Sequence, residues 1–383
     1  MAKQFLFKNI KQMTTLISIP WFTPAYLAGG PIQSVYTMVN NCDELDFKII
    51  TSNSDINELP LKNISANEWN DFNSQTKVYY GDKQFSLLKH IQLLKSVKAN
   101  AVFLIGIYSF RFTILPIFFS RSANIILSAR GMLHPPALRQ KAFKKKLYLV
   151  FFKPILKWKN VSFHATDETE KIHIQSIFGN HAKVWVAQNI PNIRKSNVSY
   201  KSEGAINLLT VALIGPMKNH LQILKALKDC KHNVHYDICG PIYFPEYWNE
   251  CLKIIQQLPS NIKVVHHGPI PPNELDSFYA NAHVFICPSQ SENFGHALFE
   301  GLSAGKPLIT SNNTPWNNLE KNYAGLNVEP IPSNIKAAID FFAVMNESEY
   351  SNWSSSAKDY SDNAVDLVEI KKAYHQMFHQ NEG

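Results

Sequence analysis

The apolar residues of this chain gather in short runs that are separated by longer segments with helical periodicity. In the first half, such runs predict strands near residues 16–20, 47–52, 101–105, 124–129, 162–166 and 183–187. The second half repeats the pattern, with strands expected near residues 206–212, 234–239, 262–267, 282–287 and 307–310. Continuous apolar strands that alternate with amphipathic helices are typical of parallel sheets covered by helices on both faces. The pattern therefore predicts an α/β fold that is built twice along the chain.

Length and composition agree with two globular domains. The 383 residues exceed what one hydrophobic core usually serves, and the chain is 45% hydrophobic and 18% charged. We expect one Rossmann-like domain over residues 1–195 and a second over residues 196–355, joined by a polar segment that begins near residue 189. The most apolar segment, residues 101–120, carries Arg111 at its centre and Pro116 beyond it, so we interpret it as a strand, a turn at Gly106 and a partly buried helix rather than a membrane span.

The cysteines and the N-terminus indicate the compartment. The five cysteines are odd in number and lack C-x-x-C spacing, so neither a disulfide framework nor a zinc site is indicated. Residues 1–13 contain no apolar core of signal-peptide length. A reducing cytoplasm fits these features best.

The stretch from Pro288 to Glu300 follows a predicted buried strand and runs into a predicted helix. Loops of this kind bind ligands in doubly wound α/β domains, because free amides at a helix start attract phosphate. The amides of Phe294 and Gly295 would face such a phosphate, between the carboxylates of Glu292 and Glu300. If the interval were helical, the two carboxylates would stand about 12 Å apart along the axis. Glycosidase carboxylates flank one bond at about 5 to 9.5 Å, so we favour a pair that holds opposite ends of one elongated ligand over a hydrolytic pair.

This stretch resembles a known family. Glu292 and Glu300 have the E-x7-E spacing of the retaining family-4 glycosyltransferases, within the sequence SENFGH at 291–296 and followed by GKP at 305–307. The resemblance covers most of the chain, strongly from about residue 208 to residue 328. It implies the GT-B fold, in which two Rossmann-like domains with parallel sheets face each other across a cleft. In that fold the last helix, here within residues 356–383, crosses back to the first domain.

The resemblance also implies a reaction, the transfer of a sugar from a nucleotide diphosphate sugar to a hydroxyl. Glu300 would bind ribose hydroxyls, Glu292 would contact the donor sugar, and Lys218 would grip the diphosphate, while the leaving phosphate oxygen helps to deprotonate the acceptor. The expected catalytic residues are Glu292 and Lys218. The expected donor-binding residues are Gly29, Gly30, Lys218, Asn293, Phe294, Gly295 and Glu300. No Asp-x-Asp cluster indicates a metal and no cofactor is expected, since basic groups would stabilise the departing charge.

Two positions depart from the family pattern. Relatives carry an arginine five positions before the lysine, where this chain has Leu213, and many place a polar residue, often histidine, where it has Ile105. These departures leave open a non-catalytic nucleotide-sugar or glycan-binding member of an assembly complex. A hydrolytic or epimerising GT-B enzyme is a third hypothesis.

The sequence SARGMLHP at 128–135 resembles an acceptor-side segment of the same family. Arg130 would pair with a phosphate on the acceptor or brace the cleft. His134 would titrate near neutrality or simply be solvated. The acceptor is expected to be a cell-surface glycan precursor of the lipopolysaccharide, O-antigen or exopolysaccharide type, carried on a lipid.

The charge of the chain is unevenly distributed. From Lys83 to Thr166 there are fifteen lysines and arginines and no acidic residue, within a chain of net charge +8. The densest part, residues 138–163, interleaves basic with aromatic and aliphatic residues, which suits a helix lying on an anionic membrane leaflet. Single-stranded nucleic acid is the competing partner, but no nucleic-acid motif accompanies the segment, and an ordinary basic face also remains open. We therefore expect a peripheral protein on the cytoplasmic face of the inner membrane that binds no nucleic acid, with these membrane-facing residues: Lys144, Lys145, Lys146, Lys153 and Lys157.

Overall fold

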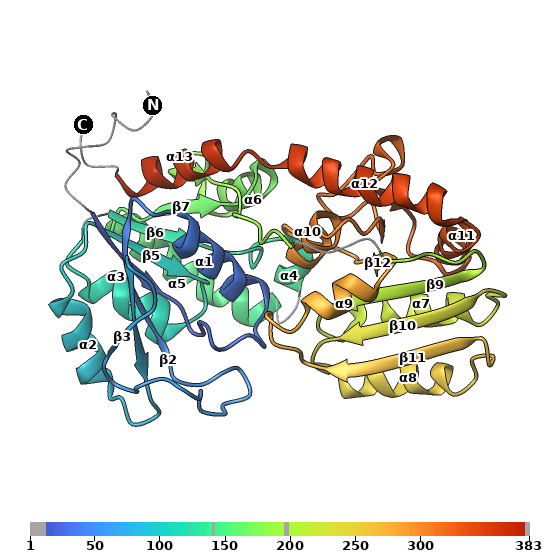
Figure 1. Ribbon diagram of the computed structural model, residues 1–383. Helices are drawn as coiled ribbons and strands as arrows, with labels where there is room; N and C mark the ends of the chain where they lie inside the picture. Colours follow the sequence, from blue (N-terminus) through green and yellow to red (C-terminus); the bar gives the residue numbers. More distant parts are fainter. Residues whose placement is uncertain (1–12, 123, 140–141, 195–198, 380–383) are drawn as a thin grey trace. The chain divides into compact units, whose positions relative to one another are not determined.

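The computed structural model describes residues 13–122, 124–139, 142–194 and 199–379 (Figure 1). Residues 1–12, which we searched for a signal peptide, and residues 195–198 of the expected linker lie outside the described residues. The chain forms two compact units: unit 1 comprises residues 1–190 and 367–383, and unit 2 comprises residues 191–366.

Within the described residues, unit 1 contains one sheet of eight strands in the order β3-β4-β2-β1-β5-β6-β7-β8. The strands are β1 (Thr14–Ser18), β2 (Asp46–Ser52), β3 (Trp69–Asp71), β4 (Thr76–Gly81), β5 (Ala101–Ile105), β6 (Asn124–Ser128), β7 (Ser162–Ala165) and β8 (Val184–Val186). Every pairing is parallel except that of β3 with β4. The strand order reverses between β1 and β5, so the loops that follow these two strands leave the sheet at its topological switch point.

The helices of unit 1 are α1 (Gly30–Asn41), α2 (Leu87–Ser96), α3 (Leu115–Phe119), α4 (Pro135–Arg139), α5 (Ala142–Trp158), α6 (Glu168–Phe178) and α13 (Leu367–Phe378), with a π-helical turn over Phe110–Ile114. Residues 101–119 are a strand followed by a partly buried helix, as predicted. Helix α13 belongs to this unit although it follows unit 2 in the sequence. Its Phe378 ring packs edge-on against Phe47 and Phe103.

Unit 2 contains a parallel sheet of six strands among the described residues, in the order β11-β10-β9-β12-β13-β14. The strands are β9 (Ala205–Val211), β10 (Asn233–Cys239), β11 (Ile262–Gly268), β12 (Val284–Cys287), β13 (Leu308–Thr310) and β14 (Gly325–Asn327). This is the strand order of a dinucleotide-binding domain, with its switch point between β9 and β12. Parallel pairing with both faces buried explains why a central strand such as β12 appears in the sequence as a continuous apolar run.

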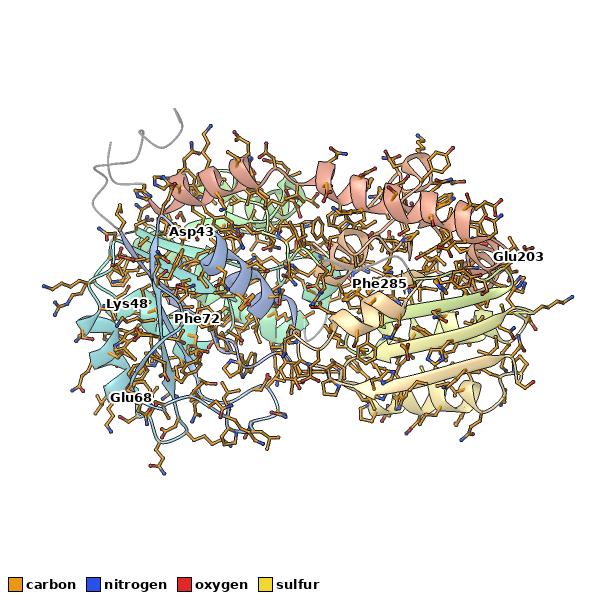
Figure 2. All side chains as sticks on the ribbon, in the orientation of Figure 1. Asp43, Lys48, Glu68, Phe72, Glu203 and Phe285 are labelled. Carbon is orange, nitrogen blue, oxygen red and sulfur yellow. The ribbon has the colours of Figure 1, made fainter. Side chains whose placement is uncertain are left out.

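Helices cover both faces of the sheet in unit 2. They are α7 (His220–Leu227), α8 (Pro245–Ile255), α9 (Asp276–Asn281), α10 (His296–Ser303), α11 (Pro332–Ala343) and α12 (Glu347–Ala364), with 3₁₀ turns at Pro216–Lys218 and Glu320–Asn322. Neighbouring residues of one strand serve opposite faces: Leu208 packs into the core under α7, α8 and α11, whereas Leu209 packs into the core under α9 and α10. Phe285 is buried in the second of these cores, while Asp43 and Glu68 of unit 1 and Glu203 of unit 2 are exposed (Figure 2).

The cysteines Cys42, Cys230, Cys239, Cys251 and Cys287 are buried and unbridged. Among the described residues, no helix combines the length and the apolar character needed to cross a bilayer.

Candidate active site

Lys218 and Glu292 come together at the switch point of unit 2. Lys218 ends the 3₁₀ turn that follows β9, and Glu292 lies in the loop that follows β12. The Gln290 amide donates to the Met217 carbonyl at 2.8 Å, which holds the two loops side by side. Adjacent strands thus place two residues that are 74 positions apart in the sequence in direct contact.

The two side chains form a largely buried ion pair. The Lys218 ammonium donates to Glu292 Oε1, and the side chains are 19% and 13% exposed, respectively. Ser289 Oγ donates to the same carboxylate oxygen at 2.6 Å. Burial disfavours the charged ammonium, but attraction by Glu292 and the hydrogen bond outweigh it and raise the pKa of Lys218 above its ordinary value. The site therefore holds a charged ammonium that an arriving anion can recruit from Glu292.

Residues 293–295 lead from this loop into α10. Phe294 is buried against Trp316 at 5.3 Å between ring centroids, and its carbonyl accepts from Trp316 Nε1 at 2.8 Å. Gly295 has φ 73° and precedes the first helical residue. A Cβ at this position would lie 2.9 Å from the end of the Leu298 side chain, so the left-handed turn and the close contact both favour glycine. The N-cap residue Gly295 has no side chain to cap the helix, and the role of these amides toward a phosphate stays a prediction.

Glu300 lies farther along α10, is 5% exposed, and is held by three donors. Arg194 Nε donates to Oε2 at 2.9 Å, the Tyr279 hydroxyl donates to the same oxygen at 3.1 Å, and Asn192 Nδ2 donates to Oε1 at 3.3 Å. Arg194, Tyr279 and Asn192 were missed in the sequence because the linker and α9 contain no motif. An arginine within the otherwise small and polar linker was the one signal that would have pointed to it.

The glycine loop of unit 1 lies at the switch point of that unit. Gly29 has φ 69°, and a Cβ added at Gly29 or Gly30 would meet no atom within 4 Å, so the backbone there is open. Asp55, a buried residue that was also missed in the sequence, fixes the approach to this loop. Its Oδ2 accepts from the amides of Tyr26 at 2.8 Å and Leu27 at 3.0 Å. Donor binding by the two glycines stays a prediction.

Arg130 follows β6 with φ 51° and turns its side chain into unit 1. Its Nη1 donates to Asn189 Oδ1, and the guanidinium lies over the Phe103 ring at 5.9 Å. Glu170, buried on α6, fixes the same loop by accepting from the Gly131 amide at 2.7 Å. In this arrangement Arg130 braces the end of unit 1, and pairing with an acceptor phosphate stays a prediction.

His134 lies beside a second histidine, His173, with ring centroids 4.7 Å apart. Burial and the neighbouring His134 lower the pKa of His173. His134 is thus half-buried in a histidine pair rather than simply solvated, and its acceptor-side role remains untested.

The two departures from the family pattern are visible at the switch points. Leu213 follows β9 and is 38% exposed. Because it is a leucine, this position carries no positive charge. Its side chain and that of Phe244 cover Gly215, where an added Cβ would lie 2.6 Å from the Phe244 ring. Ile105 ends β5 and is buried in the core of unit 1.

Helix α5 has an exposed apolar face opposite its buried one. Leu149, Phe152 and Leu156 pack into the core, whereas other large apolar residues point outward, with Phe143 81% and Trp158 71% exposed. With about 3.6 residues per turn, the outward residues fall within roughly a third of the helix circumference. They are Phe143, Leu147, Val150, Phe151 and Trp158; we call this set the α5 apolar face.

The lysines of α5 divide into two groups. Lys144, Lys146, Lys153 and Lys157 are exposed and flank the α5 apolar face. The prediction for Lys145 was wrong, because this residue falls on the buried side of the helix. Its ammonium donates to the Ala137 carbonyl at 2.6 Å and lies over the Tyr108 ring.

No set of three histidine, cysteine, aspartate or glutamate side chains in the described part of the chain is arranged to hold a metal ion. The predicted absence of a metal and of a cofactor stays a prediction.

Comparisons with known proteins agree with this geometry. Residues 191–360 match the sequence model of the family described as Glycosyl transferases group 1. The search of curated proteins found no match. Among solved structures, the chain is similar to HepE from Anabaena in complex with UDP and glucose, with 14% identity, a TM-score of 0.68, and coverage of 96% of this chain and 100% of that chain.

Two further structures show the same likeness. A glycosyltransferase from Rickettsia africae has 16% identity and a TM-score of 0.66, with coverage of 98% of this chain and 100% of that chain. WaaG, a glycosyltransferase involved in lipopolysaccharide biosynthesis, has 13% identity and a TM-score of 0.66, with coverage of 97% and 100%. At these identities the similarity establishes the fold, so the predicted GT-B class is confirmed.

Proposed function

We propose that this chain, whose residues 191–360 match the family model of Glycosyl transferases group 1, transfers a sugar from a nucleotide diphosphate sugar to a glycan hydroxyl with retention of configuration. The observation that carries the donor assignment is the buried pair of Lys218 and Glu292 at the switch point of unit 2. A site with one cation beside one carboxylate suits a ligand that carries a diphosphate next to a sugar.

Charge separation is the main demand of this reaction. The bond between the anomeric carbon and the diphosphate oxygen breaks, so the carbon gains positive and the phosphate negative charge. We propose that the diphosphate takes the Lys218 ammonium from Glu292 and that amides at the start of α10 add to its stabilisation. Glu292, released from Lys218, then faces the electron-poor sugar. The acceptor oxygen attacks on the face that the diphosphate leaves, and its proton passes to the departing phosphate oxygen.

Glu300 would hold the other end of the donor. In this proposal its carboxylate accepts a hydrogen bond from a ribose hydroxyl, as the family resemblance implies. The HepE structure contains UDP and glucose, which supports a nucleotide-linked sugar as donor for this chain. The identity of the base and of the sugar is left to experiment.

We propose a lipid-carried precursor of a cell-surface glycan as the acceptor. WaaG, which shares the fold, is involved in lipopolysaccharide biosynthesis. The α5 apolar face with its flanking lysines supports peripheral binding to an anionic bilayer, where such an acceptor would reside. In that arrangement the protein would work on the cytoplasmic face of the inner membrane.

The donor assignment is tested by thermal shift of the full chain against UDP-, GDP-, dTDP- and CMP-linked sugars, with and without magnesium. One diphosphate donor is expected to stabilise the protein, by about 2.7 kcal/mol at a concentration of one hundred times Kd. The matching nucleoside monophosphate serves as control, since it lacks the second phosphate that Lys218 would bind. The absence of any shift, together with no release of nucleoside diphosphate, would overturn the proposal.

Turnover separates the remaining hypotheses. Transfer to a glycan acceptor supports the proposed reaction. Release of free sugar from the donor without an acceptor would instead favour the hydrolytic enzyme. Donor binding with no turnover on any acceptor would favour the binding protein, and Leu213→Arg would then be the first variant to assay for recovered activity.

A further inference from the structure

The carboxylate of Glu300 is unequally occupied by the protein itself. Its Oε2 accepts from both Arg194 Nε at 2.9 Å and the Tyr279 hydroxyl at 3.1 Å. Its Oε1 accepts only a long contact of 3.3 Å from Asn192 among the described residues. A carboxylate offers about four acceptor positions, two on each oxygen. One oxygen is therefore filled and the other keeps capacity for a ligand.

Arg194 is the residue that fixes this asymmetry. Its side chain is 6% exposed, and its fork is used on two sides, with Nε on Glu300 and Nη1 on Asp276 Oδ1 at 2.6 Å and on the Pro272 carbonyl at 2.9 Å. The guanidinium also lies over the Tyr279 ring at 5.2 Å. A planar fork held at three points orients a carboxylate in a way that a lysine ammonium cannot.

We propose that Arg194 is a positioning residue that clamps Glu300 so that Oε1 alone is presented to the nucleotide. The inference rests on the proposed role of Glu300 toward ribose. It deepens that role, because a ribose carries two hydroxyls and the clamped carboxylate has one open oxygen. One hydroxyl then contributes most of the recognition, and a nucleotide that lacks it is discriminated against.

A purely structural role for Arg194 is the alternative, since the residue also ties the linker segment to α9. The two roles differ in what a variant changes. A structural residue alters the stability of the protein, whereas a positioning residue alters nucleotide affinity only while Glu300 is present to be positioned. Double-mutant analysis separates these effects.

The experiment measures Kd for UDP, GDP, dTDP and CMP by calorimetry on the full chain and three variants, namely Arg194→Met, Glu300→Gln and the double variant. We expect each single variant to bind the preferred nucleotide about tenfold more weakly, a tenfold change being about 1.4 kcal/mol. The double variant should also lose about tenfold rather than a hundredfold. Arg121→Met, at an exposed position of unit 1, is the matched control and should bind as the unchanged protein does.

The 2′-deoxy and 3′-deoxy forms of the preferred nucleotide give a second readout. The unchanged protein should bind one of them about tenfold more weakly than the ribonucleotide and the other nearly as well. Arg194→Met should bring the two deoxy forms close to parity. If Arg194→Met does not fold, Tyr279→Phe removes only one donor to Oε2 and should narrow the same difference partly.

Each other outcome is decisive. Weaker binding by Glu300→Gln with unchanged binding by Arg194→Met would overturn the positioning role and leave the proposed function intact. Additive losses would show that Arg194 acts independently of Glu300 and would also overturn it. Unchanged binding by Glu300→Gln would remove the ribose role of Glu300. No binding of any of the four nucleotides by the unchanged protein would remove the donor assignment. The proposed positioning by Arg194 would fall in both cases.

Discussion

Units 1 and 2 are both parallel sheets covered by helices, but they differ in the charged residues that lie at the switch point of each sheet. In unit 2 the loops after β9 and β12 carry Lys218 and Glu292, which are already paired, and the linker residue Arg194 is paired with Glu300 of α10. In unit 1 the corresponding loops carry open glycine backbone after β1 and the apolar Ile105 at the end of β5. The same kind of fold thus carries paired charged side chains in unit 2 and exposed glycine backbone in unit 1. The function of each unit therefore depends on its particular residues and not on the fold alone.

The exposed charge follows the opposite distribution. The segment from Lys83 to Thr166 of unit 1 contains no acidic residue that could compensate its cations. Its exposed lysines on α5, which exclude Lys145, border an apolar face. In unit 2, Lys218 and Arg194 are largely buried and paired with carboxylates. The family match covers residues 191–360, which lie in unit 2. Unit 2 therefore carries the sequence features shared with the family, whereas the basic exterior belongs to unit 1.

Removal of the Lys218 ammonium should have the largest effect, because it takes away the cation of the polar site in unit 2. Lys218→Met should lower kcat by about a hundredfold or more, because loss of one preorganised charge-stabilising group costs about 3 to 4 kcal/mol at the transition state. Initial rates with the donor identified by thermal shift measure the effect. Lys225→Met, an exposed lysine on α7, is the control and should leave the rate unchanged. A loss of less than threefold at Lys218 would show that the paired site of unit 2 does not stabilise the leaving group.

Most of the fold was predictable because a buried parallel strand appears in the sequence as a short, continuous apolar run. The strands that were missed are short or lie toward a sheet edge, such as β3 and β14 with three residues each, and β4, whose Lys77 is exposed. The expected last helix corresponds to α13, whereas α12, which ends at Ala364, is a separate helix that was not predicted. Local apolar patterns do not record which edge positions are covered, so these boundaries depend on tertiary packing.

The candidate site divides in the same way. Lys218 and Glu292 were predictable because each lies in a local motif after a buried strand. The contact between Arg194 and Glu300 was not, because it joins residues 106 positions apart and its arginine lies in an unpatterned linker. Lys145 was misplaced because all lysines of α5 were assigned to one surface, although helical periodicity turns this one inward.

Buried histidines occur in both units, so both units should lose stability as the pH falls. Burial lowers the pKa of His164 in unit 1 and of His220 in unit 2 to about 3, and of His90 in unit 1 and His283 in unit 2 to about 4. In the unfolded chain these groups titrate near 6.5, so between the folded and unfolded values the unfolded state binds more protons. Stability should be complete above pH 6.5 and should fall as the pH drops below it.

The free energy of unfolding should fall by up to about 1.4 kcal/mol per pH unit for each histidine. With two such histidines in unit 1 and two in unit 2, the loss between pH 6 and pH 5 is up to about 3 kcal/mol for unit 1 and the same for unit 2. Urea denaturation at pH 7, 6 and 5 measures it. His220→Gln should reduce the slope of unit 2 by one proton and leave that of unit 1 unchanged. A free energy of unfolding that is flat from pH 7 to pH 5 would contradict the prediction.

The smallest expected effect concerns the exterior of unit 1. Lys157→Gln removes one of the exposed lysines beside the α5 apolar face and should weaken binding to vesicles with anionic lipid by about 1 kcal/mol, or about fivefold. The loss should shrink as salt rises, because exposed charges are screened over about 10 Å at 0.1 M ionic strength. Lys253→Gln, at an exposed position on α8 of unit 2, changes the net charge equally and should have no effect. Equal losses from both variants would mean that total charge rather than the α5 surface governs binding, and preference for single-stranded oligonucleotides over vesicles would assign the basic segment to nucleic acid.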